Sequence, residues 1–467
     1  MNKYSFINRA VIIGLAALTL TGCKSLYGKY GRPEVKTSGL VRDAVSDDDT
    51  LAVTDTTSFA NIPWRSVFTD PQLQTIIETA LSNNPDLLNA ALNVDIAEAQ
   101  LKAAKLAFLP GFTFTPQGTI ASWDGQKATK TYSLPVNASW DASLFGNLTA
   151  AKRSAQMTML RSKDYQVAVQ TRLIANVANM YYTLLMLDKQ LKIVNDMETL
   201  TKNTWDIMKI QHQTVQGVRS TAVQSAESNY LSVQTQKEDL KRQIRETENS
   251  LSLLMGQQAH AIPRSTLEAQ SLPSAFSTGV GIQLLSNRAD VHANEMALAN
   301  CFYNVEAARA RFYPSLTISA TGSYTNSGGM GITNPGKMLL SAVGALTQPI
   351  FMKGQLKAGL RAAEDQYKQA YNTWQNSVLS AGSEVSNALV LYNASEKKSK
   401  IEEQRTKVLK QNVEDTRMLM ASAGSTYLEV ITAESNLLNA QLNQVQDDFY
   451  KMQAVVNLYY ALGGGAK

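Results

Sequence analysis

Apolar and polar residues alternate one by one in four short stretches of the chain. From Phe112 to Ile120 the even positions hold phenylalanine, proline, glycine or isoleucine, and the odd positions hold threonine or glutamine. The same alternation runs from Tyr132 to Trp140 and from Ser315 to Thr325, and a weaker one runs from about Met338 to Gln348. Alternation of this kind predicts strands with one apolar face and one hydroxyl-lined face.

Elsewhere the apolar residues follow a helical period. No proline or glycine interrupts the chain from about Leu148 to Gln213, and only two glycines do so from Leu356 to Ser422. Helices of this length would extend on the order of 100 Å. Apolar residues at steps of three and four form two ladders, Leu173, Val177, Met180, Leu184, Leu187, Leu191 and Val194 and then Val223, Ala226, Tyr230, Val233, Leu240, Ile244, Leu251 and Leu254. This spacing predicts antiparallel coiled-coil hairpins with tips at Gly217 and Gly424.

The chain also contains an internal duplication. Two alanine-rich segments, from about Pro85 to Ala107 and from Asp290 to Arg311, align without a gap and each precedes a proline that cannot continue a helix. Further on, the Ala-Glu-Ser-Asn tetrapeptide that ends at Asn229 recurs ending at Asn436, and a glycine follows each copy at the same distance. A duplicated chain has two similar structural units, and a ring of such chains has twice as many units as subunits.

The first residues indicate the cellular compartment. Lys3 and Arg9 precede an apolar run from Ala10 to Leu20 that is too short to span a bilayer, which is typical of a secretory signal. The ending Leu20-Thr21-Gly22-Cys23 resembles the bacterial lipobox, and this resemblance implies that Cys23 is lipidated and becomes the first mature residue. An ordinary signal peptide with an incidental cysteine is the alternative.

These patterns predict five parts of the chain, with a β-hairpin inside each repeat. The parts are a signal peptide (1–22), a lipidated N-terminal linker and equatorial segment (23–70), repeat 1 (71–257, hairpin about 111–143), an inter-repeat equatorial linker (258–284) and repeat 2 (285–467, hairpin about 315–351).

Strands of about ten residues with one apolar face are typical of a transmembrane β-barrel, although half of a soluble sandwich would show the same alternation. The lipid anchor favours the membrane. A bilayer tolerates no unpaired sheet edge, one chain supplies four strands, and the smallest barrels need about eight. We therefore expect several chains to share one barrel.

Composition excludes some functions. The formal net charge is +5, and removing residues 1–22 leaves +3, which is too weak for a nucleic-acid partner. The three histidines are widely separated, so we expect no catalytic constellation, metal or cofactor, and no enzyme. Cys301 has no second cysteine or histidine nearby and is expected to be a small buried apolar residue.

Six short segments carry a family resemblance. They are the segments 64–71 (WRSVFTDP), 80–86 (ALSNNPD), 312–315 (FYPS), 348–351 (QPIF), 427–433 (YLEVITA) and 461–465 (ALGGG). With them, nearly the whole mature chain resembles the bacterial outer membrane efflux proteins, the TolC-like outer membrane factors, in their lipoprotein branch. The resemblance implies a homotrimer with a twelve-stranded outer-membrane barrel, a periplasmic barrel of twelve helices, and export together with an inner-membrane pump and a periplasmic adaptor protein.

The resemblance also implies a gate. In the family, the segment that corresponds to 427–433 carries acidic residues that ring the narrow periplasmic entrance. Glu429 keeps a carboxylate here, whereas Thr432 stands where the family often has aspartate. The first-repeat counterpart of Glu429 is Ala222, so a charge ring in a trimer would have three members. A solvated surface acid is the alternative interpretation of Glu429, and the tips at Gly217 and Gly424 would meet the pump assembly.

Two other classes of protein share part of the pattern. A periplasmic adaptor lipoprotein also combines a lipid anchor with a coiled coil, but it would have one hairpin and soluble β domains. A structural coiled-coil lipoprotein would not need alternating strands. The doubled strand pairs therefore favour a passive exit duct in the outer membrane.

Overall fold

The computed structural model describes residues 28–34, 40, 59–122, 124–214, 219–273, 287–327, 333–421 and 426–466. Cys23, Gly217 and Gly424 lie outside these described residues. The chain divides into two compact units. The strand unit comprises residues 1–35, 92–163 and 293–376, and the hairpin unit comprises residues 36–91, 164–292 and 377–467.

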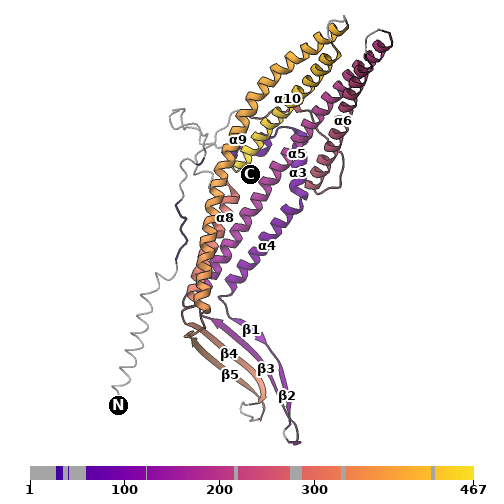
Figure 1. Cartoon of the computed structure of the whole chain (residues 1–467). Helices are drawn as coiled ribbons and strands as arrows, with labels where there is room; N and C mark the ends of the chain where they lie inside the picture. Colours follow the sequence, from indigo (N-terminus) through magenta and orange to yellow (C-terminus); the bar gives the residue numbers. More distant parts are fainter. Residues whose placement is uncertain are drawn as a thin grey trace. The chain divides into compact units, whose positions relative to one another are not determined.

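The same helices occur twice in the same order (Figure 1). Their lengths match, because α4 and α8 each have 22 residues, α6 and α10 each have 35, and α5 and α9 have 68 and 67. Their bounds are α4 (Pro85–Leu106), α5 (Asn147–Thr214), α6 (Ser220–Leu254), α8 (Ala289–Ala310), α9 (Gln355–Ala421) and α10 (Tyr427–Ala461). The predicted duplication and the predicted long helices are confirmed.

Shorter elements precede and separate the repeats. They are η1 (Phe59–Asn61), α2 (Trp64–Val67), α3 (Pro71–Asn83) and η2 (Leu267–Ala269). Asp70 caps α3 by accepting a hydrogen bond from the Gln72 backbone N–H at 2.9 Å. Within the part of the chain that the structure describes, no helix combines the length and the apolar character needed to cross a membrane.

The strands form one antiparallel sheet in the strand unit (Figure 1). Its members are β1 (Gly111–Phe114), β2 (Gln117–Ala121), β3 (Thr129–Asp141), β4 (Ser315–Ser327) and β5 (Thr333–Thr347). β3 pairs with β4, β4 pairs with β5, and both β1 and β2 pair with the other edge of β3. Since β1 and β2 together form one row, the sheet has four rows, and these confirm the four predicted stretches.

The first row is interrupted, which the alternation did not predict. β1 ends at Phe114, opposite Val136, and β2 begins at Gln117, opposite Ser133, so both segments share one register with β3. Pro116 in the gap has no N–H, and Pro135 on β3 has none either. The Thr115 N–H still donates to the Pro135 carbonyl at 3.3 Å, but Pro135 returns no hydrogen bond because proline has no N–H. The interruption thus weakens the ladder without shifting the side chains to the other face.

The pairing aligns the apolar positions into one continuous face. Val136 lies opposite Phe114 on one side and opposite Gly322 on the other, and Gly322 lies opposite Leu340. The opposite face carries polar side chains that hydrogen-bond to one another, such as the hydroxyl groups of Ser133 and Ser323, whose oxygens are 2.7 Å apart. Leu340 remains 74% exposed in the single chain. An apolar face of this kind marks a surface that meets a lipid or another protein.

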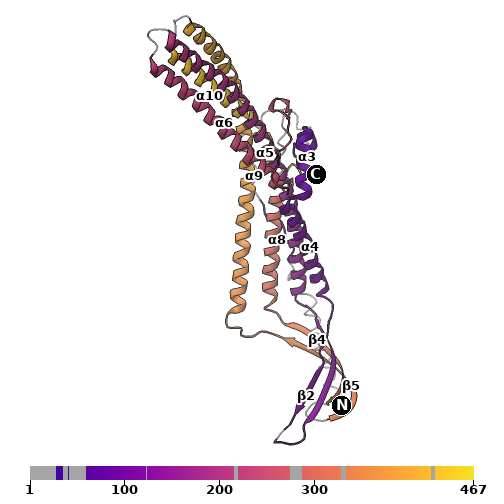
Figure 2. The ribbon, with the colours of Figure 1, turned by 90° about the vertical axis from the view of Figure 1, so that its right-hand side faces the viewer.

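The hairpin unit is held together by the predicted coiled-coil ladders. On α5 Val177, Leu184 and Val194 have no exposed surface, and on α6 Val233 and Leu251 are buried. The α5–α6 hairpin and the α9–α10 hairpin run side by side in this unit (Figure 2). The predicted seam is therefore confirmed as packing between helices.

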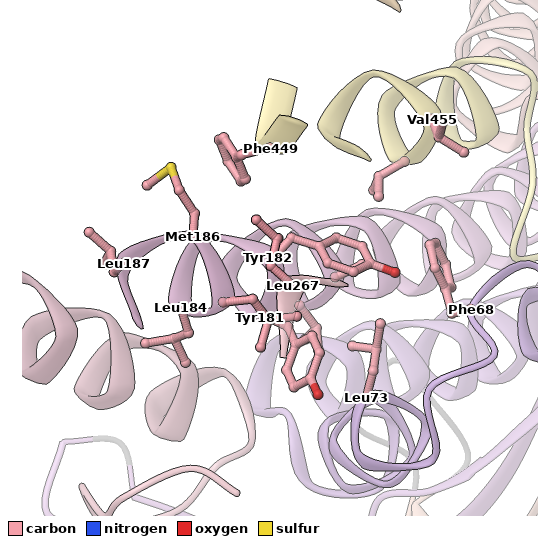
Figure 3. Packing of buried hydrophobic residues seen from close by; sticks show 14 of the residues in the cluster. Phe68, Leu73, Tyr181, Tyr182, Leu184, Met186, Leu187, Leu267, Phe449 and Val455 are labelled. Atoms are coloured by element: carbon pink, nitrogen blue, oxygen red, sulfur yellow. The ribbon is translucent and has the colours of Figure 1, made fainter. Parts of the chain in front are cut away.

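The same buried core continues where the short elements meet the long helices. Phe68 and Leu73 from the N-terminal segment pack with Tyr182 of α5 and with Phe449 and Val455 of α10 (Figure 3). Most of these side chains are fully buried, and burying each one stabilises the fold by about 1.5–3 kcal/mol.

A polar group ties the inter-repeat linker to this core. Asp70 accepts hydrogen bonds from Tyr181 at 2.6 Å, from Gln270 at 2.9 Å and from Ser265. Burial alone would raise the pKa of Asp70, but these hydrogen bonds stabilise the carboxylate and lower its pKa overall. Asp70 therefore stays charged and joins α3, α5 and the linker.

Candidate gate and partner-contact site

Glu429 is held at the beginning of α10. Thr426 is the N-cap, and its side chain accepts a hydrogen bond from the Glu429 backbone N–H. In return, Glu429 Oε2 accepts a hydrogen bond from the Thr426 N–H at 3.2 Å. This capping box satisfies two N–H groups that the helix leaves without partners, and the helix dipole favours a negative charge there. The carboxylate therefore has a defined structural role whatever else it does.

The first turns of α10 have one buried face and one exposed face. Val430 and Ala433 are buried, whereas Glu429 and Thr432 are exposed. Residues three apart on a helix lie on the same side, so Glu429 and Thr432 share the exposed face. Ala222, the first-repeat counterpart of Glu429, is buried instead.

The buried face contacts a small apolar cluster, which we call the tip cluster. It contains Met208 of α5, Ala222 and Ala226 of α6, Met420 of α9 and Val430 of α10. Trp205 and Tyr230 stack beside it with ring centroids 5.5 Å apart, and Lys209 Nζ lies 3.6 Å from the centroid of the Trp205 ring. The tip cluster joins all four long helices where each hairpin turns, so it fixes the exposed face that carries Glu429.

A second acid of α10 was missed by the sequence analysis. Glu434 has no exposed surface, and Thr204 of α5 donates a hydrogen bond to Glu434 Oε1 at 2.6 Å. Glu434 Oε2 accepts no hydrogen bond from the described residues. Burial raises the pKa of Glu434, although the Thr204 hydrogen bond and the charge of Arg417 oppose this. The recurring Ala-Glu-Ser-Asn tetrapeptide contained the residue, but it served only as evidence of duplication.

The structure differs from the prediction made for Cys301. Cys301 is only half-buried on α8, so it is not the buried apolar residue that was expected. Burial raises the pKa of its thiol. Among the described residues no group of histidine, cysteine, aspartate or glutamate could hold a metal ion.

Two matched helical hairpins and a four-row sheet with an exposed apolar face are typical of a membrane channel, and comparisons with known proteins identify its family. The outer membrane efflux protein family model matches residues 76–257 and 281–464, once for each repeat. The cation efflux system protein CusC of Escherichia coli (strain K12) is 29% identical over 458 residues, which cover 96% of this chain and 98% of that protein. The probable outer membrane lipoprotein SilC of Salmonella typhimurium is 26% identical and covers 96% of each chain.

A solved structure shows the same fold. The open state of the Neisseria gonorrhoeae MtrE outer membrane channel matches with a TM-score of 0.82 at 24% sequence identity, over 94% of this chain and 98% of that chain. The chain belongs to the outer membrane efflux protein family. It is an outer-membrane efflux channel that extends into the periplasm, not an enzyme. The adaptor and the structural lipoprotein are thereby set aside as alternatives.

Proposed function

We propose that three copies of this chain form the exit duct of a tripartite efflux system, which receives small molecules from an inner-membrane pump through a periplasmic adaptor protein. The observation that carries the proposal is the sheet. Its apolar face is aligned across all rows, and its outer edges, on β1 and β5, pair with no strand among the described residues. Three such sheets would pair edge to edge into a twelve-stranded barrel and leave no open edge in the lipid.

The helices support the same assembly. Each chain supplies two hairpins, so three chains would place twelve helices side by side, and at about 10 Å spacing these enclose a tube roughly 40 Å across at the helix axes. The tips at Gly217 and Gly424 would contact the adaptor and pump. A tube of this width conducts solutes without gripping them, so the pump selects the cargo.

We further propose that Glu429 forms a ring of three carboxylates at the periplasmic entrance, with Thr432 beside it. Its place on the exposed face of α10, opposite the tip cluster, supports this role. Like charges brought together at a constriction attract cations and repel one another, which influences both selectivity and closure.

The test of the ring separates charge from helix capping. Glu429→Gln removes the charge but keeps a side chain that can accept the Thr426 N–H, whereas Glu429→Ala removes both. We expect Glu429→Gln to lower the cation preference of the channel in planar bilayers by roughly a factor of 2–10 at low salt. Screening should reduce the difference in high salt.

The matched control is Glu246→Gln, which removes an exposed charge on α6 about 40 Å along the helix from its beginning. The control should leave ion selectivity unchanged. If Glu429→Gln conducts with the selectivity of the parent protein while only Glu429→Ala differs, Glu429 is a helix cap and not a gate residue.

The N-terminal anchor is the remaining part of the proposal. We infer that Cys23 carries the lipid that attaches the chain to the outer membrane, as its lipobox-like context implies and as the name of the relative SilC supports. Cys23→Ser should abolish incorporation of labelled fatty acid. A Cys23→Ser protein that still incorporates the label would refute the assignment.

A further inference from the structure

An apolar groove of about 450 Å³ lies in the strand unit where α4 ends and the sheet begins. One wall is the segment Phe108, Leu109 and Pro110, and the other is formed by Trp140 of β3 and by Ile318 and Ala320 of β4. The volume falls within the range of ligand sites, about 300–1,000 Å³. The lining is almost entirely apolar, so the groove suits a ligand without polar groups.

The residues around the groove are those of a membrane–water boundary. Trp140 Nε1 donates a hydrogen bond to the Phe108 carbonyl at 2.9 Å, and Lys152 Nζ lies 5.9 Å from the centroid of the Phe108 ring. Tryptophan is enriched at this boundary, and lysine reaches from it toward the polar headgroups. The groove opens on the apolar face of the sheet, at the end of β3 and β4 that adjoins the helices. In the proposed channel this end lies in the periplasmic leaflet.

The N-terminal segment runs toward the groove. The Arg32 guanidinium forms a salt bridge with Glu295 at 2.6 Å, and four residues earlier the Gly28 carbonyl accepts a hydrogen bond from Arg153 at 3.1 Å. A Cβ atom on Gly28 would lie 2.9 Å from the Phe302 ring, so this backbone lies directly against α8. Glu295 and Phe302 are about 10 Å apart along α8, which leads into β4. The segment therefore runs nearly extended along α8, with its N-terminal end toward the strands.

The same turn of α5 contacts both the segment and the groove. Arg153 binds Gly28, and the preceding residue, Lys152, lies over Phe108. Cys23 is five residues before Gly28, and five residues span at most about 18 Å. From Phe302 to the end of α8 at Ala310 is about 12 Å, so this reach brings Cys23 to the level at which the sheet begins.

We propose that one acyl chain of the Cys23 lipid lies in the groove between Phe108–Pro110 and Trp140, Ile318 and Ala320. The inference rests on the proposed function through the lipidation of Cys23 and the direction of the apolar face. An acyl chain bound there would attach the N-terminal segment to the outer wall of the channel. Without the groove, the acyl chain would be dissolved in the bulk bilayer.

The experiment uses the full-length protein in its own membrane. Cells would be grown with a diazirine fatty acid, irradiated, and the purified protein digested and analysed by mass spectrometry. We expect a cross-linked product that joins the Cys23 peptide to peptides containing Phe108 to Pro110, Trp140 or Ile318. The product should be absent in Cys23→Ser.

A matched pair of variants tests the groove itself. Ala320→Phe would fill it, whereas Ala342→Phe places the same side chain on the same face directly opposite, on β5, outside the groove. We expect the yield of the cross-link to fall at least fivefold in Ala320→Phe and to stay unchanged in Ala342→Phe. The set of cross-linked peptides from the parent protein decides the question even if Ala320→Phe folds poorly.

Two results would overturn the proposal. In the first, the groove peptides carry phospholipid adducts equally with and without Cys23, so that a bilayer lipid is the occupant. In the second, the Cys23 peptide cross-links evenly over the sheet, and Ala320→Phe does not change the cross-link yield. Conductance of the same preparation tests the channel separately: loss of conductance with the cross-link intact counts against the duct, and a conducting channel without the cross-link counts against the groove.

Discussion

Glu429 and Glu434 lie five residues apart on α10 and have opposite surroundings. Glu429 is exposed and caps its own helix. Glu434 is fully buried and accepts a hydrogen bond from Thr204 of α5, which belongs to the other hairpin. The difference follows from the helical period, because residues five apart on an α-helix point in different directions.

Burial of Glu434 should make stability depend on pH. Its pKa is raised in the folded state, so the folded protein retains a proton that the unfolded chain releases above about pH 4.5. The contribution of Glu434 to stability is therefore fully present below that pH and declines as the pH rises through the raised pKa. Glu434→Gln should remove this decline and raise the thermal midpoint at pH 7 in detergent, because the amide carries no charge to desolvate.

Thr204→Val provides the converse variant. It leaves Glu434 Oε1 without its donor and should cost about 1–3 kcal/mol, most of all where the carboxylate is charged. A Glu434→Gln protein that melts below the parent at pH 7, or with the same pH slope, would contradict this account of the buried acid.

At the residue scale the sequence predicted exposure only in part. The coiled-coil ladders identified the buried apolar residues because spacing alone determines which face packs. Spacing does not determine what packs opposite a given position. The burial of Glu434 depends on α5, which supplies Thr204, and the half-exposure of Cys301 depends on the neighbours of α8.

At the scale of elements, both repeats use the same joint after the second helix of each hairpin. Asn84 Nδ2 donates to the Leu254 carbonyl at 2.9 Å, and Arg288 Nη1 donates to the equivalent carbonyl, that of Ala461, at 3.3 Å. Arg288 is buried, and its charge is balanced by Asp290 and Glu384. Both repeats therefore keep the hydrogen bond to this carbonyl, but the donor is Asn84 in repeat 1 and Arg288 in repeat 2.

The glycines of these joints should resist substitution. Gly256 has φ +65° and Gly463 has φ +91°, and an added Cβ would lie 2.6 Å from the Asn83 oxygen and 2.5 Å from the Asn287 oxygen. Gly256→Ala and Gly463→Ala should each destabilise the protein by more than about 1 kcal/mol, because both the backbone and the contact are strained.

Gly359→Ala is the matched control. Gly359 lies inside α9 with no atom within 4 Å of an added Cβ, so alanine should stabilise the helix by about 0.5–1 kcal/mol. Thermal midpoints of the three variants in detergent provide the comparison. Equal effects at all three positions would show that the joints impose no special constraint.

Most elements could be predicted because proline and hydrophobic spacing determine where they begin and end. α4 and α8 end just before the prolines at 110 and 314, and the two predicted ladders lie on α5 and α6. The break between β1 and β2 could not be predicted from alternation, because the alternation continues through Pro116. It depends on Pro135 lying next to the same gap across the sheet, which is a matter of register.

At the scale of the whole molecule, a single chain leaves the apolar face of its sheet exposed and the sheet edges unpaired among the described residues. The sheet has an apolar face, with Phe112 70% exposed, and two edges that no described strand covers. In a bilayer each unpaired backbone group would cost several kcal/mol. The sequence indicated this need through the strand count and the duplication, whereas the number of subunits came from the family resemblance.

The subunit count therefore tests the account most directly. The protein would be extracted from outer membranes in mild detergent, and its mass measured by light scattering corrected for bound detergent. We predict three chains per particle, which closes a barrel of twelve strands. A stable monomer would leave four rows with open edges and would contradict the proposed duct.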